Sequence, residues 1–278
     1  MNKKKILRFL NDGISALVKI FLLLIIIYPF AWMILTSFKP YKETLIYPPT
    51  FFPKVWTTEG YQEAFRSINV LHYLKNSIVV AFAVLVLQFI IVIPSAYAFA
   101  RCKIPFKGAF FAVVLLGFML PQQVVFIPLY MFFSKLKMLK SYWPQILPFI
   151  SNAFGIFLLR QYFMQIPEEI IEAARLDHAS ELKIITHIMI PQAKSALFAI
   201  GLIIFIGNWN SYFWPLIMTT TDTFRTLPVG VAMLKDAEGF RMWNMIMAGN
   251  VILSAPILIA YGIANKQIRK AFVYSGIK

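Results

Sequence analysis

The sequence is poor in the residue types on which many enzymes and secreted domains rely. It has one cysteine among 278 residues, which excludes an intrachain disulfide and a metal site built from several thiolates. The three histidines, His72, His178 and His187, are spaced without a ligand pattern such as HxxxH. No GxxxxGK(S/T) phosphate-binding loop is present. We therefore expect no metal, no cofactor and no ATP bound by this chain itself.

Charged residues are scarce as well. Asp, Glu, Lys and Arg make up 14% of the chain and hydrophobic residues 59%, so a soluble protein of this composition would expose too much apolar surface. The net charge of +15 raises the alternative of nucleic-acid binding. However, the basic residues lie at the ends of apolar runs, where membrane proteins contact lipid headgroups. We expect a cell-membrane protein that contacts lipid and binds no nucleic acid.

Six apolar segments are long enough to cross a hydrocarbon core of about 30 Å, which takes roughly 20 helical residues. The expected spans cover residues 17–37, 76–100, 109–133, 142–162, 196–218 and 243–264. Prolines inside several of them predict kinks, and Asn76 is predicted to cap the second helix. The predicted fold class is all-α, a single integral membrane domain over residues 1–278 with six transmembrane helices.

The basic residues also predict the orientation. Lys3, Lys4 and Lys5 precede the first span, which is too long for the core of a cleaved signal peptide and is expected to stay as an anchor. Lys and Arg are in weak excess in the connections that lie inside if the N-terminus does. The short basic connection at residues 101–108 and the basic C-terminal tail give the best support. Both termini are predicted to be cytoplasmic.

The interiors of the six spans contain no Asp, Glu, Lys, Arg or His. Lys19 and Arg160 fall within the expected spans but lie near their ends. Ion-coupled carriers usually keep ionisable groups at membrane depth, and a membrane enzyme needs a polar catalytic cluster. This absence weighs against both classes. Sodium sites made of backbone carbonyls leave the ion-coupled carrier open as an alternative, and a scaffold without a transport role is another.

One segment, residues 166–191, interrupts the apolar pattern; we call it the insert. It carries five of the twelve acidic residues, Glu168, Glu169, Glu172, Asp177 and Glu181. Its pattern predicts a first helix after Pro167 that ends near Asp177 and His178, with an apolar edge made of Ile166, Ile170, Ala173 and Ala174. A second helix is predicted from about Glu181 to Ile190, with an apolar edge made of Ile184, Ile185, Ile188 and Met189. Periodicity alone allows either a solvated loop or a docking surface for a soluble partner.

The insert resembles the "EAA" loop of bacterial ABC-importer permeases. That pattern reads EAA, three residues, Gly, nine residues, Ile, one residue, Leu-Pro. Glu172-Ala173-Ala174 is followed at the same spacings by His178, Ile188 and Ile190-Pro191. His178 replaces the glycine and Ile190 the leucine. Since histidine visits the left-handed region more readily than most residues, we expect the turn at His178 to be kept, at a cost of about 1 kcal/mol. Direct contact between His178 and a partner is the alternative.

Further segments are similar to the carbohydrate-uptake branch of these permeases, and to the second permease of maltose-type systems. They are Asn208-to-Leu216 (NWNSYFWPL), Thr226-to-Gly230 (TLPVG), Met242-to-Gly249 (MWNMIMAG) and the tail 267–278. That branch often reads WNDFLWPL, TLPVGL and a tail ending near Gly-x-x-x-Gly-x-x-Lys. The first of those tail glycines is absent here. The likeness covers residues 76–278 well and the N-terminal quarter loosely.

The resemblance implies a transmembrane subunit of an ATP-driven ABC importer for a sugar, an oligosaccharide or a related polyol. The implied partners are a second permease, two ATPase subunits that hold ATP and Mg, and an extracytoplasmic solute-binding protein. The implied residues for contact with the ATPase are Glu172, Ala173, Ala174, Asp177, His178, Ile188 and Pro191. Such a subunit has no catalytic site of its own. A permease for a non-sugar solute remains an alternative.

Sugar contact in the bundle requires hydrogen-bonding groups and aromatic faces. Candidates for the substrate path are Asn152, Asn208, Trp209, Asn210, Tyr212 and Trp214. The three aromatic residues among them have a second interpretation, an interfacial aromatic belt at the outer end of the fifth span.

Overall fold

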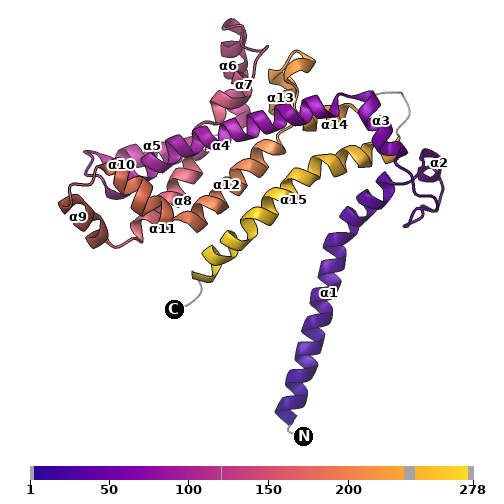
Figure 1. Cartoon of the computed structure of the whole chain (residues 1–278), viewed down its shortest axis with the longest axis horizontal. Coiled ribbons are helices and arrows are strands. Elements are labelled where there is room, and N and C mark those ends of the chain that lie inside the picture. Colours follow the sequence, from indigo (N-terminus) through magenta and orange to yellow (C-terminus); the bar gives the residue numbers. More distant parts are fainter. Residues whose placement is uncertain (1–2, 120, 235–241, 275–278) are drawn as a thin grey trace. The chain divides into compact units, whose positions relative to one another are not determined.

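The structure is a computed structural model that describes residues 3–119, 121–234 and 242–274. The described residues are helical or irregular, with no strand among them, in line with the all-α prediction. The chain forms two compact units: residues 1–70 with 231–255 form unit 1, and residues 71–230 with 256–278 form unit 2. Figure 1 labels the helices of both units.

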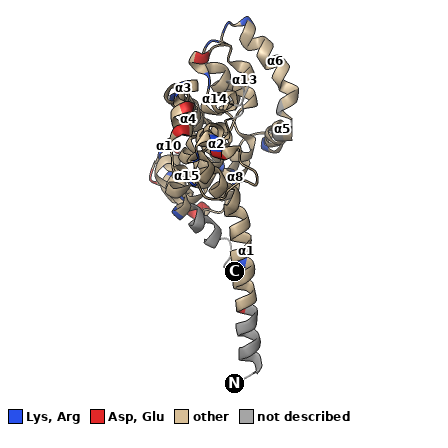
Figure 2. Cartoon of the chain, turned by 90° about the vertical axis from the view of Figure 1, so that its right-hand side faces the viewer, with Lys and Arg blue, Asp and Glu red and all other residues tan. Residues whose placement is uncertain are grey.

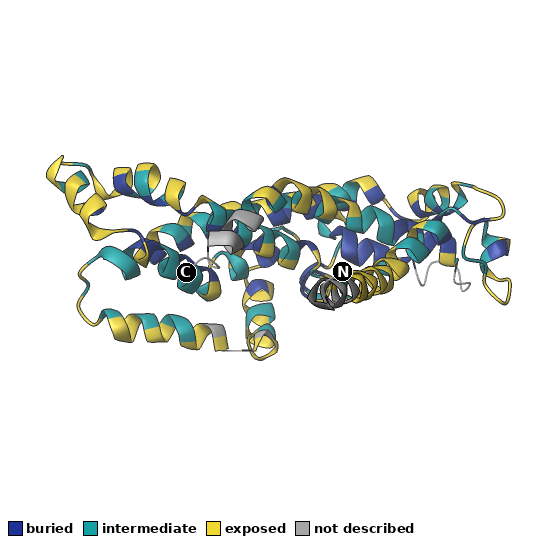
Figure 3. Ribbon diagram, turned by 90° about the horizontal axis from the view of Figure 1, so that it is seen from below, coloured by how far each residue is buried: buried dark blue, intermediate teal, exposed yellow. Residues whose placement is uncertain are grey.

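Unit 1 contains the N-terminal helix, two short helices and the first half of the last helix. Their bounds are α1 (Lys3–Ser37), α2 (Tyr41–Thr44), α3 (Glu59–Ser67) and α15 (Trp243–Tyr274), which continues into unit 2. The apolar side chains of α1 are exposed along residues 14–30, and Figure 3 shows this helix in yellow over most of its length. A row of exposed Leu, Ile and Phe of this length is stable in lipid and not in water.

The connection after α1 is held by a buried carboxylate. Glu43 accepts hydrogen bonds from the Thr50 hydroxyl at 2.8 Å and from the Lys54 backbone N–H at 3.0 Å. Burial alone raises the pKa of the Glu43 carboxyl, but these hydrogen bonds outweigh it and the pKa lies below its ordinary value. The ammonium group of Lys39 lies 4.8 Å from the centroid of the Trp32 ring. The segment is therefore folded tightly against the end of α1.

Unit 2 contains most of the helices. In chain order they are α4 (Val70–Arg101), α5 (Lys107–Met119), α6 (Gln122–Lys135), α7 (Trp143–Ile146), η1 (Leu147–Phe149), α8 (Ala153–Met164), α9 (Glu168–Leu176), α10 (Glu181–Ile184), η2 (Ile185–Met189), α11 (Ile190–Gln192), α12 (Lys194–Trp209), α13 (Phe213–Met218), η3 (Asp222–Phe224) and α14 (Leu227–Met233), the last of which ends in unit 1. The core of unit 2 joins buried side chains of α4, α8, the insert and α12, with Val84, Leu159 and Ile200 among its members.

Four described segments are long and apolar enough to cross a membrane, at residues 12–37, 70–101, 143–164 and 243–267. A fifth arises if the helices of residues 181–192 and 194–209, bent by 84°, count as one. Residues 107–117 and 123–135 form shorter apolar helices. Figure 2 shows the charged residues of the described helices as scattered patches on a tan ribbon. The chain is thus a multi-pass membrane protein.

Three of the expected spans contain an interruption of the helix. In the third, α5 ends at Met119 and α6 begins at Gln122, with Pro121 in an extended conformation as its cap. In the fourth, a 3₁₀ turn that contains Pro148 precedes α8. In the fifth, α12 ends at Trp209 and α13 begins at Phe213. Proline removes a backbone donor and disfavours helical backbone before it, which accounts for the first two.

Asn76 is not a helix cap, as the sequence predicted, because α4 begins six residues earlier at Val70. Its amide is fully buried and donates to the backbone oxygens of Thr223 at 2.9 Å and Arg225 at 2.7 Å, while the Tyr142 hydroxyl donates to its side-chain oxygen at 2.6 Å. Asn76 therefore joins α4 to segments far away in the sequence. Local capping rules do not capture such a long-range role.

Candidate functional site

The insert forms the two predicted helices. Pro167 precedes α9 in an extended conformation, and Glu168 and Glu169 lie in the first turn, where the helix dipole favours negative charge. Ser180 caps α10 by accepting a hydrogen bond from the Lys183 N–H at 3.3 Å. The helical backbone then continues through a π turn at residues 185–189 to α11, which ends at Gln192.

The turn between the two helices is left-handed at His178, where φ is 56°. The N–H of Ala179 donates to the carbonyl oxygen of Ala174 at 3.0 Å, and the N–H of His178 donates to the carbonyl oxygen of Arg175 at 3.0 Å. This pair of bonds is the Schellman motif, which usually has glycine at the position of His178. The prediction of a left-handed turn at His178 is confirmed.

Each helix of the insert has one buried face. Ile171 of α9, Ile184 of α10 and Met189 are fully buried in the core of unit 2. Of the apolar edge predicted for α9, Ile166 is buried and Ile170 is 39% exposed, and the adjacent Ile171 takes the core position. The helix pairs two adjacent isoleucines, and periodicity could not decide which of them faces the core.

The opposite face of the insert is open. Glu172 and Ala173 are exposed, and Leu176 and Leu182 are 81% and 70% exposed. Of the other residues expected to contact an ATPase, Asp177, His178 and Pro191 are exposed, whereas Ala174 and Ile188 are partly buried against the core. The exposed face thus combines small, acidic and apolar side chains.

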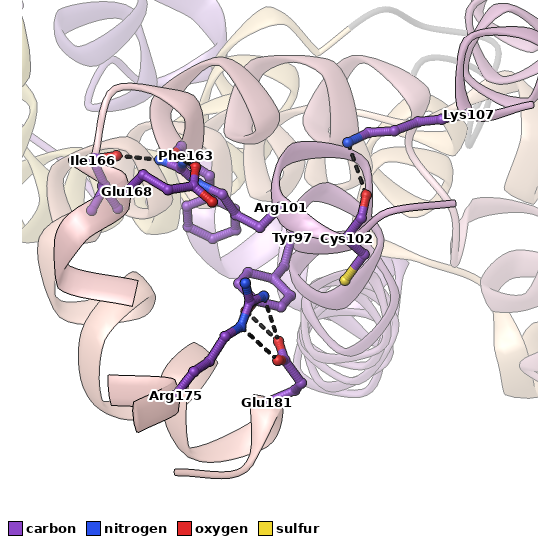
Figure 4. Close-up of polar contacts among 9 residues, drawn as sticks. All are labelled: Tyr97, Arg101, Cys102, Lys107, Phe163, Ile166, Glu168, Arg175 and Glu181. Carbon is purple, nitrogen blue, oxygen red and sulfur yellow. Dashed lines mark hydrogen bonds and ion pairs between the residues drawn. The ribbon is translucent and has the colours of Figure 1, made fainter. Parts of the chain in front are cut away.

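An ion pair closes the insert. The Nε of Arg175 in α9 donates to Oε1 of Glu181 in α10 at 3.0 Å, and the Tyr97 hydroxyl of α4 donates to the same carboxylate (Figure 4). The hydrogen bonds from Tyr97 and Arg175 lower the pKa of the Glu181 carboxyl. Since Glu181 stays ionised at neutral pH, the two helices are held together across the left-handed turn.

Unit 2 also contains an apolar groove of about 690 Å³ and a polar cavity. The polar cavity, of about 650 Å³, is the candidate substrate site. Its polar lining residues are Gln88, Ser151, Asn152, Asn208 and Ser211. The residues described around it include no Asp, Glu, Lys, Arg or His. Such a lining suits uncharged, hydrogen-bonding groups.

Gln88 and Asn152 form a fixed pair in this cavity. Nε2 of Gln88 donates to the carbonyl oxygen of Phe149 at 2.5 Å, and Nδ2 of Asn152 donates to Oε1 of Gln88 at 3.2 Å. Oδ1 of Asn152 accepts from the Gly155 N–H at 2.9 Å and so caps α8. Among the described residues, each amide nitrogen uses one of its two N–H donors in these bonds.

The structure separates the residues expected along the substrate path. Asn152, Asn208 and Trp214 line the polar cavity, and the Trp214 indole N–H donates to the carbonyl oxygen of Pro144 at 2.8 Å. Trp209 is buried, stacks on Phe205 and lines the apolar groove of about 690 Å³. Asn210 and Tyr212 are exposed, and the described lining of the polar cavity does not include them.

Several residues of these sites were not singled out from the sequence. Gln88 and Ser211 line the cavity, and Tyr97 and Arg101 contact the insert. Gln88 carries a recognisable signal, because an amide in the middle of a long apolar span has to find polar partners inside the protein. Arg101 was counted only as a basic residue of a connection, and its role depends on a fold that charge patterning does not give.

Comparisons with known proteins agree with this structure. Residues 93–274 match the family described as "Binding-protein-dependent transport system inner membrane component". The chain is 35% identical over 196 residues to the sn-glycerol-3-phosphate transport system permease protein UgpE of Salmonella typhi, which covers 70% of each chain. The chain belongs to this family. The prediction of an ABC-importer permease is therefore confirmed.

Further relatives of this permease extend the likeness to nearly the whole chain. The UgpE protein of Brucella abortus (strain 2308) is 29% identical over 274 residues, 96% of this chain and 97% of that protein. A chain of a bacterial ABC transporter involved in the import of the acidic polysaccharide alginate superposes with a TM-score of 0.81 at 24% identity, over 96% of this chain and 98% of its own. A second structure of a bacterial alginate ABC transporter, in complex with an alginate pentasaccharide-bound periplasmic protein, superposes with a TM-score of 0.66 at 14% identity. These two structures establish the likeness of fold.

Proposed function

We propose that this permease imports a sugar or a related polyol, as one of two permeases in an ABC importer. The observation that carries the substrate class is the polar cavity, whose amide and hydroxyl groups suit a hydroxylated, uncharged ligand segment. Trp214 adds an aromatic wall. The names of the relatives, which refer to sn-glycerol-3-phosphate and to alginate, support a polyol or saccharide substrate.

We further propose that the insert binds an ATPase subunit in the cytoplasm. Its support is the contrast between the two faces of α9: Ile171 is fixed in the core, whereas Glu172, Ala173 and Leu176 are exposed. The small side chain of Ala173 lets another surface approach closely, and exposed leucines are suited to burial against it. ATP binding would draw two ATPases together, and the insert would move as a rigid lever that switches access in the bundle.

The remaining partners and the topology belong to the same proposal. A second permease completes the path, and an extracytoplasmic binding protein delivers the substrate. The chain forms one permease domain with six spans, and both termini and the insert lie in the cytoplasm. Helices α5 and α6 together would form one span, and α12 and α13 together would form another. The irregular backbone between the two helices of each pair is tolerated in a membrane where protein covers it. The exposed apolar side chains of α1 support contact with lipid or a second permease.

The permease makes and breaks no covalent bond in this scheme. Hydrolysis takes place on the ATPases, which hold ATP and Mg, and this chain binds no cofactor and no metal. Its contribution is to convert the movement of the insert into a change in the exposure of the polar cavity. The transport cycle is therefore a shift between two conformations of the complex, for which ATP has different affinities.

Two measurements test this function. Purification of the tagged chain in mild detergent, after expression with its neighbouring genes, should recover an ATPase and a second permease. The purified complex in vesicles should then take up a sugar or polyol only with ATP and the binding protein, in a panel that includes amino acids, peptides and ions. Uptake by this chain alone, or exclusive uptake of a peptide or an ion, would contradict the proposal.

A further inference from the structure

The C-terminal end of α4 contacts the insert at two places. Tyr97 and Arg101 are four residues apart and therefore project from the same face of α4, one turn apart. Figure 4 shows Arg101 next to the start of α9 and Tyr97 next to the ion pair of Arg175 and Glu181. The two side chains thus reach the beginning of α9 and the beginning of α10.

Arg101 connects α4 to the end of α8 and the start of α9. Its side chain is 7% exposed, and Nη1 donates to Oε2 of Glu168 at 2.5 Å. Nη2 donates to the carbonyl oxygens of Phe163, at 2.7 Å, and of Ile166. Carbonyl groups at the end of a helix lack intrahelical donors and attract positive charge. The buried guanidinium therefore has a carboxylate and two carbonyl oxygens as partners, one of them at the end of α8 and the other two at the start of the insert.

Tyr97 connects α4 to both helices of the insert. Its hydroxyl donates to the carboxylate of Glu181 in α10 and lies 3.5 Å from Nη2 of Arg175 in α9. Tyr97 is 2% exposed, and it belongs to the same core as the fully buried Ile171 and Ile184. Packing and hydrogen bonding therefore act on the same side chain.

The contacts matter because α4 has no chain connection to the insert. Helices α8 and α12 join the insert through the backbone and follow it directly, whereas α4 can follow only through side-chain contacts. The same helix carries Gln88, the partner of Asn152 and Phe149 in the polar cavity. Arg101 lies thirteen positions after Gln88, which corresponds to about 20 Å along a helix. One continuous helix therefore links the insert with the cavity.

We propose that Tyr97 and Arg101 are positioning residues that fasten α4 to the insert, so that α4 carries the movement of the insert to the Gln88–Asn152 pair. The proposal rests on the proposed function, because it assumes that the insert is moved by an ATPase. It adds a route by which that movement reaches the substrate cavity. Neither residue is among the described lining residues of the polar cavity.

The test is the ratio of substrate taken up to ATP hydrolysed, measured in vesicles with the complete transporter and its binding protein. Tyr97→Phe removes a single hydroxyl group, and Arg101→Met removes the charge while it keeps much of the volume. We expect the ratio to fall about fivefold or more in each, the lower end of typical coupling between two sites, while ATP hydrolysis continues. Arg101→Lys should give an intermediate ratio, because an ammonium group keeps one ionic contact and loses the planar fork.

Arg160→Met is the matched control. Arg160 also donates to α4, to the carbonyl oxygen of Phe99 at 3.1 Å, but its second contact is the Phe111 ring of α5 and not the insert. It should keep the wild-type ratio. If Arg101→Met does not assemble, Tyr97→Phe and Arg101→Lys decide. A wild-type ratio in both, a parallel loss of hydrolysis and uptake, or an equal loss in Arg160→Met would overturn the inference. Absence of ATP-driven uptake in the wild-type complex would instead overturn the proposed function.

Discussion

The insert and the polar cavity lie in the same compact unit, but they are specified in different ways. In the insert, neighbours in the sequence decide the structure: Pro167 and Ser180 begin the helices, and His178 turns the chain between them. In the cavity, Gln88 comes from α4, Asn152 from the cap of α8 and Asn208 from α12, and only tertiary packing brings them together. Local signals therefore predict the structure of the insert, whereas they do not predict which side chains meet in the cavity.

The largest effect is expected on the open face of the insert. Ala173→Asp and Glu172→Lys should abolish ATP-coupled uptake, because each places an unsuitable charge on the surface proposed to meet the ATPase. Membrane insertion and the fold of α9 should be unaffected, since both positions are exposed. Uptake in vesicles and co-purification of the ATPase measure the effect.

The control is a charge reversal outside the insert, on α3 of unit 1. Glu63→Lys breaks an exposed ion pair with Arg66 on α3, and exposed pairs contribute about 0–1 kcal/mol. It should keep uptake near the wild-type level. Undiminished transport by both insert variants would remove the docking hypothesis.

The second-largest effect is expected in the cavity. Gln88→Leu leaves the Phe149 carbonyl without its donor and Asn152 without its acceptor, and a buried polar group without a partner costs about 1–3 kcal/mol. We expect weaker thermal stability and slower uptake. Thermal unfolding of the purified complex and the initial rate of uptake measure both.

Asn208 and Asn210 form a matched pair for the same cavity. Asn208 lines it, whereas Asn210 is exposed and is not among its described lining residues. Asn208→Ala should raise the half-saturating substrate concentration, and Asn210→Ala should not. The opposite order would place the substrate path on the other side of α12 from the cavity.

These contrasts show how far the sequence reaches. The motif spacing from Glu172 to Pro191 predicted two helices and a left-handed turn, because helix ends and turns depend on a few adjacent residues. The periodicity did not show which of the adjacent Ile170 and Ile171 enters the core, since adjacent apolar residues fit a helical face equally well. Asn76 was assigned a local capping role and instead binds Thr223 and Arg225, about 150 positions away. The predicted tail motif ends outside the described residues.

The aromatic cluster near the end of α12 makes the same point. The sequence predicted either substrate contact or a membrane-interface belt for these aromatic residues, and it did not show which residue has which role. In the structure Trp209 and Trp214 are both buried but line different spaces, and Tyr212 is 43% exposed. The helix is interrupted between Trp209 and Phe213, and no periodicity rule follows a side chain through such a break.

A moderate effect is expected at the turn of the insert. His178→Gly should keep uptake, because glycine adopts the left-handed region without strain. His178→Val should lower stability by about 1–2 kcal/mol, because a β-branched residue tolerates positive φ poorly. Thermal unfolding of the complex measures this. Loss of uptake in His178→Gly at unchanged stability would show that the imidazole itself contacts a partner.

The smallest effect is expected from pH. The pKa of the Glu181 carboxyl is lowered, so its stabilising contribution is fully present above the ordinary carboxyl pKa of about 4.3 and is lost as the pH falls through the lowered value. Glu181 is half-exposed, which screens the interaction. The thermal stability of wild type relative to Glu181→Gln should therefore be greater at pH 7 than at pH 3.5. An equal difference at both values would contradict this assignment.

The central claim is that the insert receives force from an ATPase on the cytoplasmic side. It is tested most directly by a photo-reactive residue placed at Leu176, which is 81% exposed on the insert, and at Tyr47, which is 92% exposed in the connection expected outside. Irradiation of the complete transporter should join position 176 to the ATPase, and position 47 should give no ATPase adduct. An ATPase adduct at position 47, or an adduct of position 176 with the extracytoplasmic binding protein, would contradict the account.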